Sequence, residues 1–445
     1  MNFAQHLYNL ALWSVQPLLR RKLARRAQAE PVYAQAVPER FGHYTQAAEG
    51  HSDLVWVHAV SLGETRAAAV LIQSLRQTLP GMRLLLTHGT ATGRTEGTRL
   101  LQSGDVQVWQ PWDTPATVQR FLRHFKPRIG VLIETEVWPN LVLQCQQLGV
   151  PLALANARMS EKSTRKALRW PQLTRPVYQA LQAVWAQTEA DAARLQQLGA
   201  SAPQVLGNIK FDAQPDAAQC AQGQAWRAAA QRPIAMLASS REGEEEAWLQ
   251  ALQAPIDSPA HKQPESAAPC GSASGVQWLI VPRHPQRVDA VEALLRSHGW
   301  RVSRRSQWGP QGPQVAEPQN QPSIWLGDSL GEMTLYYSLA DVALLGGSFA
   351  PWGGQNLIEA AACGCPVITG PHTFNFAQAA DMAVQAGAAL RVSDMAEAVT
   401  RSLELLGDEA QLKSRSEEAH RFAMAHQGAA QRTAQAVAEL LVERR

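Results

Sequence analysis

Short apolar runs alternate with segments of helical periodicity along almost the whole chain, and this pattern restricts the fold class strongly. In the first half, strands are predicted at residues 54–58, 83–87, 128–133, 152–156 and 183–187. In the second half, they are predicted at residues 234–238, 278–281, 323–326, 342–345 and 366–369. Strands that alternate with helices form parallel sheets, and 445 residues exceed one ordinary core. We therefore expect an α/β protein of two domains, joined where the periodicity fades near residues 212–230.

The composition narrows the classes of function. Hydrophobic residues make up 45% of the chain and charged residues 18%, as in globular proteins. The net charge of +3 is small for this length, and no basic block indicates nucleic acid as the main partner. The five cysteines form no CxxC pair and no metal-ligand spacing, which favours a reducing compartment. Residues 256–275 are rich in Pro, Ser, Ala and Gly, and we expect them to be a flexible insertion.

Residues 1–26 differ from the α/β pattern. An apolar helix face is followed at once by a basic cluster: Leu7, Leu10, Ala11, Trp13, Leu18 and Leu19, then Arg20, Arg21, Lys22, Arg25 and Arg26. The apolar part is short for a bilayer span, which needs ~20 residues, and no secretory cleavage site follows it. We expect a helix that lies in a membrane interface with its basic cluster on anionic headgroups. The alternative is an ordinary amphipathic helix on the protein surface.

The segment 345–376 is predicted to form the end of a strand, a glycine loop, a helix and a second strand, in this order. Glycines before a helix start let backbone N–H groups approach a phosphate, and the helix dipole favours negative charge there. Asn356 opens the predicted helix, and Glu359 is suited to accept hydrogen bonds from a ribose. The alternative is a βαβ turn without a ligand.

Polar clusters also follow the predicted strands of the first half, where ligands bind in parallel sheets. Ser61, Gly63 and Glu64 follow the first strand; Glu64 is either a general base or the partner of Ser61 in a capping box. Thr90 and Gly93 follow the second strand and form either a sugar contact or a plain turn.

Two further clusters of the first half suit a polyhydroxyl or phosphorylated ligand. Glu136 and Asn140 follow the strand at 128–133, although Glu136 is also well placed as a helix cap. Arg158 leads a basic run with Lys162, Arg165, Lys166 and Arg169, which is either a solvated face or a site for an anionic acceptor.

In the second half, Pro282 and Arg283 follow one strand and residues 327–332 follow the next. Together with the loop before Glu359, these strand ends offer contacts for an anion and a ribose, which favours a nucleotide site. The chain contains no HExxH, Cys/His cluster or DxD pair, so no metal ligands are indicated.

Nine ordered motifs resemble those of the 3-deoxy-D-manno-octulosonic acid (Kdo) transferases of Gram-negative bacteria. They extend from about residue 30 to about residue 380 and read VHAVSLGE, THGTATG, IETEVWPN, LANARMSEKS, GNIKFD, ASSREGEEE, IVPRHPQR, GDSLGEM and GGSFAPWGGQN–LIEAAA–GPHTFNF. The resemblance implies a GT-B fold, in which two Rossmann-like domains face each other across a cleft. It places a membrane-associated helix at 1–26, an acceptor domain at 27–215 and a donor domain at 225–445.

The resemblance also implies the reaction. Family members move Kdo from CMP-Kdo to lipid IV(A) in lipopolysaccharide biosynthesis, with inversion and without a metal or other cofactor. They act at the cytoplasmic side of the inner membrane, so the partners expected are CMP-Kdo, lipid IV(A) and membrane lipids, with no nucleic acid.

Residue roles follow by direct match to the motifs. The family's catalytic base corresponds to Glu64. The CMP contacts correspond to Pro282, Arg283, Leu330, Gly331, Glu332, Asn356, Leu357, Ile358 and Glu359. The acceptor or sugar contacts are expected among Ser61, Gly63, Thr90, Gly93, Glu136, Asn140, Arg158 and Lys210.

The chain departs from the family pattern at two positions. Gln355 stands where His is common before the Asn of the nucleotide loop, and Arg241 follows Ser240 where Thr-His is frequent. Alternative functions are a GT-B transferase for another nucleotide sugar, a sugar-nucleotide epimerase, and a catalytically silent nucleotide-binding scaffold at the membrane. The sequence does not indicate the number of Kdo units, the acylation preference or the oligomeric state.

Overall fold

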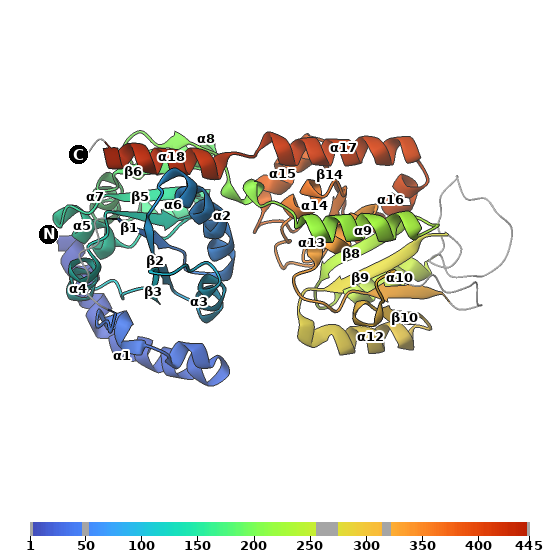
Figure 1. Cartoon of the computed structure of the whole chain (residues 1–445), viewed down its shortest axis with the longest axis horizontal. Coiled ribbons are helices and arrows are strands. Elements are labelled where there is room, and N and C mark those ends of the chain that lie inside the picture. The colour runs from blue at the N-terminus through green and yellow to red at the C-terminus, as the bar shows by residue number, and fades with distance from the viewer. Residues whose placement is uncertain (1–2, 47–52, 255–274, 314–321, 443–445) are drawn as a thin grey trace. The chain divides into compact units, whose positions relative to one another are not determined.

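The structure, a computed structural model, describes residues 3–46, 53–254, 275–313 and 322–442, which form two compact α/β units (Figure 1). Unit 1 contains the described residues up to Ala213 and those from His426 onward, and unit 2 contains Gln214–Ala425. The expectation of two α/β domains is therefore confirmed. The insertion expected at 256–275 lies outside the described residues, except for Gly275.

Unit 1 is built on seven parallel strands in the order β3-β2-β1-β4-β5-β6-β7. The strands are β1 (Leu54–His58), β2 (Arg83–His88), β3 (Val106–Trp109), β4 (Ile129–Ile133), β5 (Leu152–Ala157), β6 (Ala183–Ala186) and β7 (Gln204–Val205). The helices are α1 (Phe3–Ala29), α2 (Leu62–Thr78), α3 (Ala91–Thr98), α4 (Pro115–Phe125), α5 (Pro139–Gln147), α6 (Glu161–Ala167), α7 (Pro171–Gln179), α8 (Glu189–Gln197) and α18 (Ala429–Val442). Three 3-10 turns complete the unit: η1 (Pro31–Ala34), η2 (Val37–Phe41) and η3 (Ile209–Asp212).

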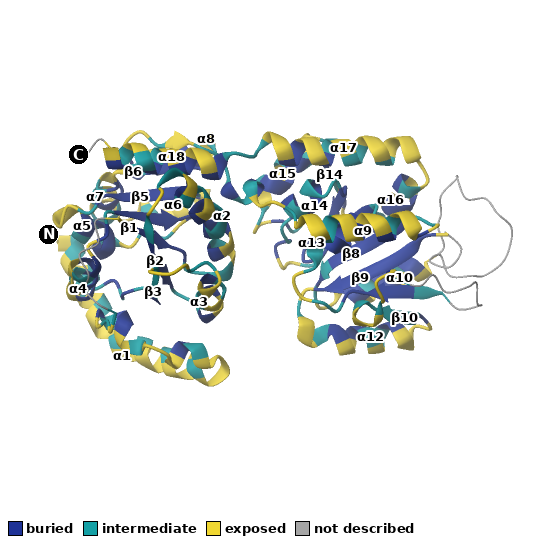
Figure 2. Cartoon of the chain, viewed as in Figure 1, coloured by how far each residue is buried: buried dark blue, intermediate teal, exposed yellow. Residues whose placement is uncertain are grey.

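The central strands β1, β4 and β5 of this sheet are buried on both faces, as Figure 2 shows. Alternate side chains of a strand point to opposite faces, so Trp56 joins one hydrophobic core whereas Val55 and Val57 join another. The second core also contains Val437 and Leu441 of α18. The expected boundary that placed all C-terminal helices in the second domain is therefore wrong for α18, because its apolar face is buried against unit 1.

Unit 2 has its own sheet of seven parallel strands, in the order β10-β11-β9-β8-β12-β13-β14. The strands are β8 (Ile234–Ser240), β9 (Gln277–Pro282), β10 (Arg301–Arg304), β11 (Ser323–Leu326), β12 (Val342–Leu345), β13 (Val367–Thr369) and β14 (Ala389–Arg391). The helices are α9 (Ala217–Ala229), α10 (Glu244–Gln253), α12 (Val288–Ser297), α13 (Met333–Leu339), α14 (Ile358–Ala362), α15 (Ala377–Gln385), α16 (Met395–Leu406) and α17 (Glu409–Ala425). The 3-10 turns are η4 (Pro285–Arg287) and η5 (Arg305–Gln307).

The strand order of each sheet reverses near its centre. In unit 1 the point of reversal lies between β1 and β4, and in unit 2 it lies between β8 and β12. Ligands of open parallel sheets bind beyond the carboxyl ends of the strands at such a point. The residues that follow these four strands are therefore the first candidates for functional sites.

Helix α1 contacts the rest of unit 1 through polar residues near its start and through Leu23 and Ala27, which pack against a small hydrophobic cluster around Trp109. The Tyr8 hydroxyl donates a hydrogen bond to Asp113 Oδ2 at 2.8 Å, and the Asn140 side-chain amide donates to Asn9 Oδ1 at 2.8 Å. Its exposed large hydrophobic residues are Phe3, Leu7, Leu10, Trp13, Val15 and Leu18. Within the described ranges, no helix combines the length and apolar character needed to cross a membrane.

Candidate active site and nucleotide site

The switch point of unit 1 positions Glu64. Ser61 is the N-cap of α2 and accepts a hydrogen bond from the Glu64 N–H at 3.4 Å. The Glu64 carboxylate accepts from the Val60 N–H at 2.8 Å and from the Ser61 hydroxyl at 2.9 Å. The capping arrangement expected as one alternative is thus present, and it holds the carboxylate at the carboxyl end of β1.

Burial sets the protonation behaviour of this carboxylate. Desolvation raises the pKa of Glu64, and the hydrogen bonds from Val60 and Ser61 act in the opposite direction. The nearby charge of Glu134 raises the pKa of Glu64 further. Burial destabilises the charged form of a carboxylate, so a buried carboxylate takes up a proton more readily than an exposed one. Uptake of a proton is what a general base must do.

Two more carboxylates follow β4 beside Glu64. Glu134 has a positive φ of 61°, and its Oε1 lies 2.6 Å from the Lys210 ammonium group on η3. Burial raises the pKa of Glu136 to about 7, the charge of Glu64 contributes to the rise, and the Trp138 indole N–H hydrogen bond at 2.9 Å opposes it. The structure therefore brings Glu136 and Lys210, two predicted site residues, into the surroundings of Glu64.

Thr90 and Gly93 support the loop that carries Ser61. The Thr90 hydroxyl donates to the Val60 carbonyl at 3.0 Å and, as N-cap of α3, accepts from the Gly93 N–H. A Cβ atom at Gly93 would lie 2.9 Å from the Val60 carbonyl oxygen, so only glycine permits this close approach. A Cβ at Gly63 would meet nothing within 4 Å, so packing does not require glycine there.

The other predicted residues of this half have different surroundings. The buried Asn140 amide donates to the Asp113 carbonyl at 2.5 Å and to Asn9, so its side chain fixes α1 to the domain. Arg158 is half-buried, and its N–H donates to the Glu134 carbonyl at 3.4 Å. The basic side chains of Lys162, Arg165, Lys166 and Arg169 are exposed.

The three predicted nucleotide motifs follow β9, β11 and β12 of unit 2. Strand β8 lies between β9 and β12, so four successive strand ends form the row. Pro282 ends β9, and the Arg283 N–H donates to the Ser240 carbonyl of β8 at 3.0 Å. Leu330 is 77% exposed and Gly331 has a positive φ of 80°, whereas the Glu332 carboxylate pairs with Arg305 at 3.0 Å.

The third motif surrounds a helix that is shorter than predicted. Helix α14 has five residues and begins at Ile358, because the Asn356 side chain caps the Ile358 N–H at 3.1 Å. Leu357 and Ile358 are buried, so their side chains pack in the core. The Glu359 carboxylate accepts from the Thr334 hydroxyl at 3.2 Å.

Glu244, which the motif analysis did not single out, organises the glycine loop after β12. Its carboxylate accepts hydrogen bonds from the N–H groups of Gly347 at 2.7 Å, Phe349 at 3.1 Å and Ala350 at 3.3 Å. A buried side-chain carboxylate thus occupies these three backbone N–H groups. In the sequence, Glu244 and the glycine loop after β12 are far apart, and no motif links them.

Gln355 and Arg241, the two departures from the family pattern, both lie close to Gly347. A Cβ at Gly347 would lie 3.1 Å from the Gln355 side-chain nitrogen and 3.7 Å from Arg241 Cγ. The Arg241 guanidinium also stacks on the Trp352 ring at 4.3 Å, and Trp352 is 43% exposed. Both replacements thus border the predicted nucleotide loop.

Comparisons with known proteins identify the family. The family model for 3-deoxy-D-manno-octulosonic-acid transferase (Kdo transferase) matches residues 35–213. A 3-deoxy-D-manno-octulosonic acid transferase of Bordetella pertussis is 45% identical over 443 residues, which cover 98% of this chain and 99% of that protein. The chain belongs to the Kdo transferase family. Another 3-deoxy-D-manno-octulosonic acid transferase, from Haemophilus influenzae, is 30% identical over 430 residues, which cover 96% of each chain.

A solved structure agrees with the Kdo transferase family at the level of the fold. A glycosyltransferase of Rickettsia africae superposes with a TM-score of 0.55 at 12% identity, covering 90% of this chain and 99% of that one. The two parallel-sheet units thus resemble those of GT-B glycosyltransferases, and the predicted family, the enzyme class and the two α/β domains are confirmed.

Proposed function

We propose that the enzyme moves Kdo from CMP-Kdo to lipid IV(A) in lipopolysaccharide biosynthesis, with inversion and without a metal. Membership of the Kdo transferase family supports the sugar that is transferred. The observation that carries the proposal is the Glu64 carboxylate, which is held by Val60 and Ser61 beyond the end of β1 with a raised pKa.

In the proposed step, Glu64 takes the proton from an acceptor hydroxyl as that oxygen attacks the anomeric carbon of Kdo. The bond from this carbon to the CMP phosphate breaks in the same displacement, and CMP leaves with the electron pair. Two fixed hydrogen bonds orient the carboxylate before the reaction, which lowers the cost of reaching the attacking geometry.

The row of strand ends in unit 2 is the proposed CMP site. Arg283 is suited to the phosphate, because a guanidinium forms charge-assisted hydrogen bonds with phosphate oxygens. Glu359 is suited to the ribose hydroxyls, and Gly331 supplies a turn that L side chains rarely adopt. The transfer requires the donor on unit 2 to reach Glu64 on unit 1.

The exposed cations near Arg158 are the proposed contacts for the phosphates of the acceptor. Lys162, Arg165 and Lys166 lie on α6, which follows the β5 segment that contains Asn156. Asn156 itself has a positive φ of 52°, a conformation that residues other than glycine rarely adopt and that is frequent at functional sites.

Helix α1 is the proposed contact with the cytoplasmic side of the inner membrane. Asp113 and Asn140 bind polar residues of this helix, whereas Leu10 and Trp13 are exposed. A helix of this kind inserts its apolar face into the headgroup region, and cations at its end bind anionic lipids.

The test is mass spectrometry of lipid IV(A) after incubation with the purified enzyme and CMP-Kdo, with a metal chelator present. We expect mass gains of whole Kdo units together with release of CMP. The matched control is Glu64→Gln, since glutamine can still accept from Val60 but cannot take a proton. Its transfer rate should fall by about 10²–10⁴-fold with CMP affinity unchanged. No product from intact substrates, or full activity of the variant, would refute the proposal.

A further inference from the structure

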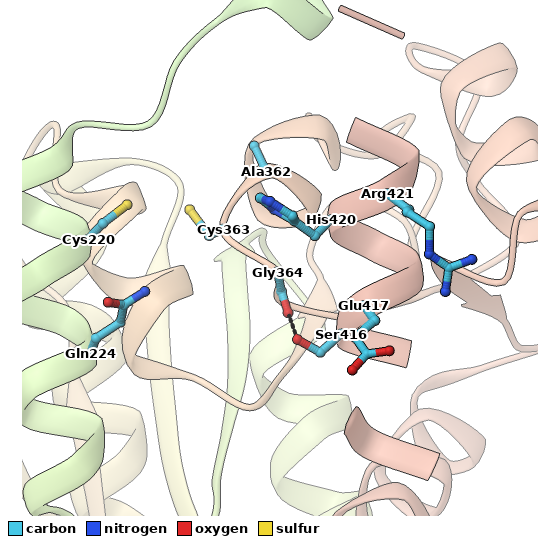
Figure 3. Close-up of a pocket in the computed structure, with 9 residues that line it drawn as sticks. All are labelled: Cys220, Gln224, Ala362, Cys363, Gly364, Ser416, Glu417, His420 and Arg421. Atoms are coloured by element: carbon cyan, nitrogen blue, oxygen red, sulfur yellow. Dashed lines mark hydrogen bonds between the residues drawn. The ribbon is translucent and has the colours of Figure 1, made fainter. Parts of the chain in front are cut away.

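A cavity of about 530 Å³ lies in unit 2 at the end of α14 opposite to Glu359. Its lining includes Cys220 and Gln224 of α9, Cys363 beyond the end of α14, and Ser416 and His420 of α17 (Figure 3). The Cys220 and Cys363 side chains point toward one another in this view. Neither thiol is fully buried, and both are free cysteines.

Helix α9 is held firmly at the turn that carries Cys220. The neighbouring Gln219 donates to the Gly331 carbonyl at 3.0 Å and accepts from the Leu335 N–H at 3.4 Å. One turn later on the same face, a Cβ at Gly223 would lie 2.5 Å from the Leu335 carbonyl oxygen, so α9 and α13 pack in close backbone contact. The direction in which Cys220 points is therefore fixed by packing.

The second thiol is fixed equally well. Cys363 Sγ contacts the Thr334 carbonyl at 3.9 Å, and the Ser416 hydroxyl donates to the Gly364 carbonyl at 2.7 Å. Burial raises the pKa of Cys363 to about 12, and its neighbour Cys220 contributes to this rise. Cys363 is thus a protonated thiol that lines the cavity together with Cys220.

We propose that Cys220 and Cys363 are a redox-sensitive pair that closes to a disulfide when the protein is exposed to hydrogen peroxide. The Cys220 sulfur attacks the peroxide oxygen, the O–O bond breaks, and a sulfenic acid and water form. The Cys363 sulfur then displaces the sulfenic oxygen as a second water, which forms the S–S bond. For hydrogen peroxide, two thiols lose two electrons and two protons, and the peroxide becomes two water molecules.

The cross-link joins α14, which contains the proposed nucleotide contact Glu359, to α9, which holds the proposed contact Gly331 in place. Helix α9 holds Gly331 through Gln219, and α14 begins at the turn capped by Asn356 and contains Glu359. This consequence rests on the proposed CMP site. A covalent bond between α9 and the end of α14 restricts both loops, so oxidation should change the affinity for CMP.

The cross-link is tested on the full-length chain carrying Cys270→Ser, since Cys270 lies outside the described residues. The reduced protein is treated with hydrogen peroxide, blocked with N-ethylmaleimide under denaturing conditions and digested. We expect a Cys220–Cys363 peptide pair that dithiothreitol separates, with the buried Cys145 and Cys365 recovered as alkylated thiols. Oxidation of Cys220 to sulfinic acid with Cys363 still alkylated would overturn the proposal.

The coupling to the nucleotide site is tested by titrating CMP into the reduced and oxidised forms. We expect the dissociation constant for CMP to change at least threefold on oxidation, and dithiothreitol to reverse the change. The Cys220→Ser protein should show no change, which excludes damage elsewhere. An unchanged constant in a fully cross-linked sample would refute the coupling, whereas a reduced protein that does not bind CMP would count against the proposed CMP site alone.

Discussion

Replacing Glu244 by glutamine tests how the glycine loop of unit 2 is held. Glu244 is 2% exposed, and one carboxylate oxygen accepts from the N–H groups of Gly347 and Arg241 at 2.7 and 2.9 Å. The other oxygen accepts from Phe349 and Ala350 at 3.1 and 3.3 Å. Glutamine retains one acceptor oxygen and presents an NH₂ group in place of the other, so two backbone donors lose their partner.

The magnitude follows from these four hydrogen bonds. A buried donor that is left without an acceptor costs about 1–3 kcal/mol, so two of them cost about 2–6 kcal/mol. Removing a buried charge offsets part of this cost, because desolvation raises the pKa of Glu244 and so disfavours its ionised form. We therefore expect Glu244→Gln to lower the free energy of unfolding by about 2–4 kcal/mol.

The assay is urea unfolding followed by tryptophan fluorescence, together with a CMP titration in the absence of urea. The control is Glu246→Gln, an exposed glutamate in the same first turn of α10, which should change the free energy by less than about 0.5 kcal/mol. A loss of less than 0.5 kcal/mol for Glu244→Gln would refute the argument that this carboxylate organises the loop. Unchanged CMP affinity in a destabilised variant would show that the loop geometry does not serve nucleotide binding.

Two further predictions concern unit 1. The pKa of Glu136 is raised from 4.5 to about 7, so its contribution to native stability is full below pH 4.5 and is lost as the pH rises through 7. The melting temperature of the wild type minus that of Glu136→Gln should therefore decrease as the pH rises from 4.5 to about 7. A difference that does not change with pH would contradict the raised pKa of Glu136. On α1, Trp13→Glu should weaken flotation with anionic vesicles, whereas Ser14→Glu, which adds the same charge at an exposed polar position, should weaken it less. Equal flotation of both variants would argue against insertion of Trp13.

The sequence predicted the interior strands of both sheets well and missed the four edges. All ten predicted strands are present, and strands 54–58, 323–326 and 342–345 have the predicted bounds. The strands that were not predicted are β3 and β7 in unit 1 and β10 and β14 in unit 2, which are the outer strands of the two sheets. Edge strands are less buried than central ones, and β7 and β10 contain no buried residue. Such strands need fewer apolar residues, so they lack the continuous apolar run on which the prediction depends.

The candidate site was predictable where its residues follow a strand in the chain. Glu64, Arg283 and Glu359 were predicted in this way, because the carboxyl end of a parallel strand marks a ligand position. Glu244 and the Tyr8–Asp113 contact were missed, since each joins residues more than a hundred positions apart: 103 for Glu244 to Gly347 and 105 for Tyr8 to Asp113. Local patterns contain no information on such pairs.

The two interpretations of Glu64 as a cap and as a base are compatible in this structure. The hydrogen bonds that make Glu64 a cap are the same ones that orient its carboxylate, and by themselves they would lower its pKa. Desolvation opposes them and is the larger effect, so the net pKa is raised. The carboxylate is thus both fixed and basic, whereas an exposed capping glutamate would be fixed but weakly basic. Burial beside Glu134, rather than the capping sequence, is what suits Glu64 to the proposed role of general base.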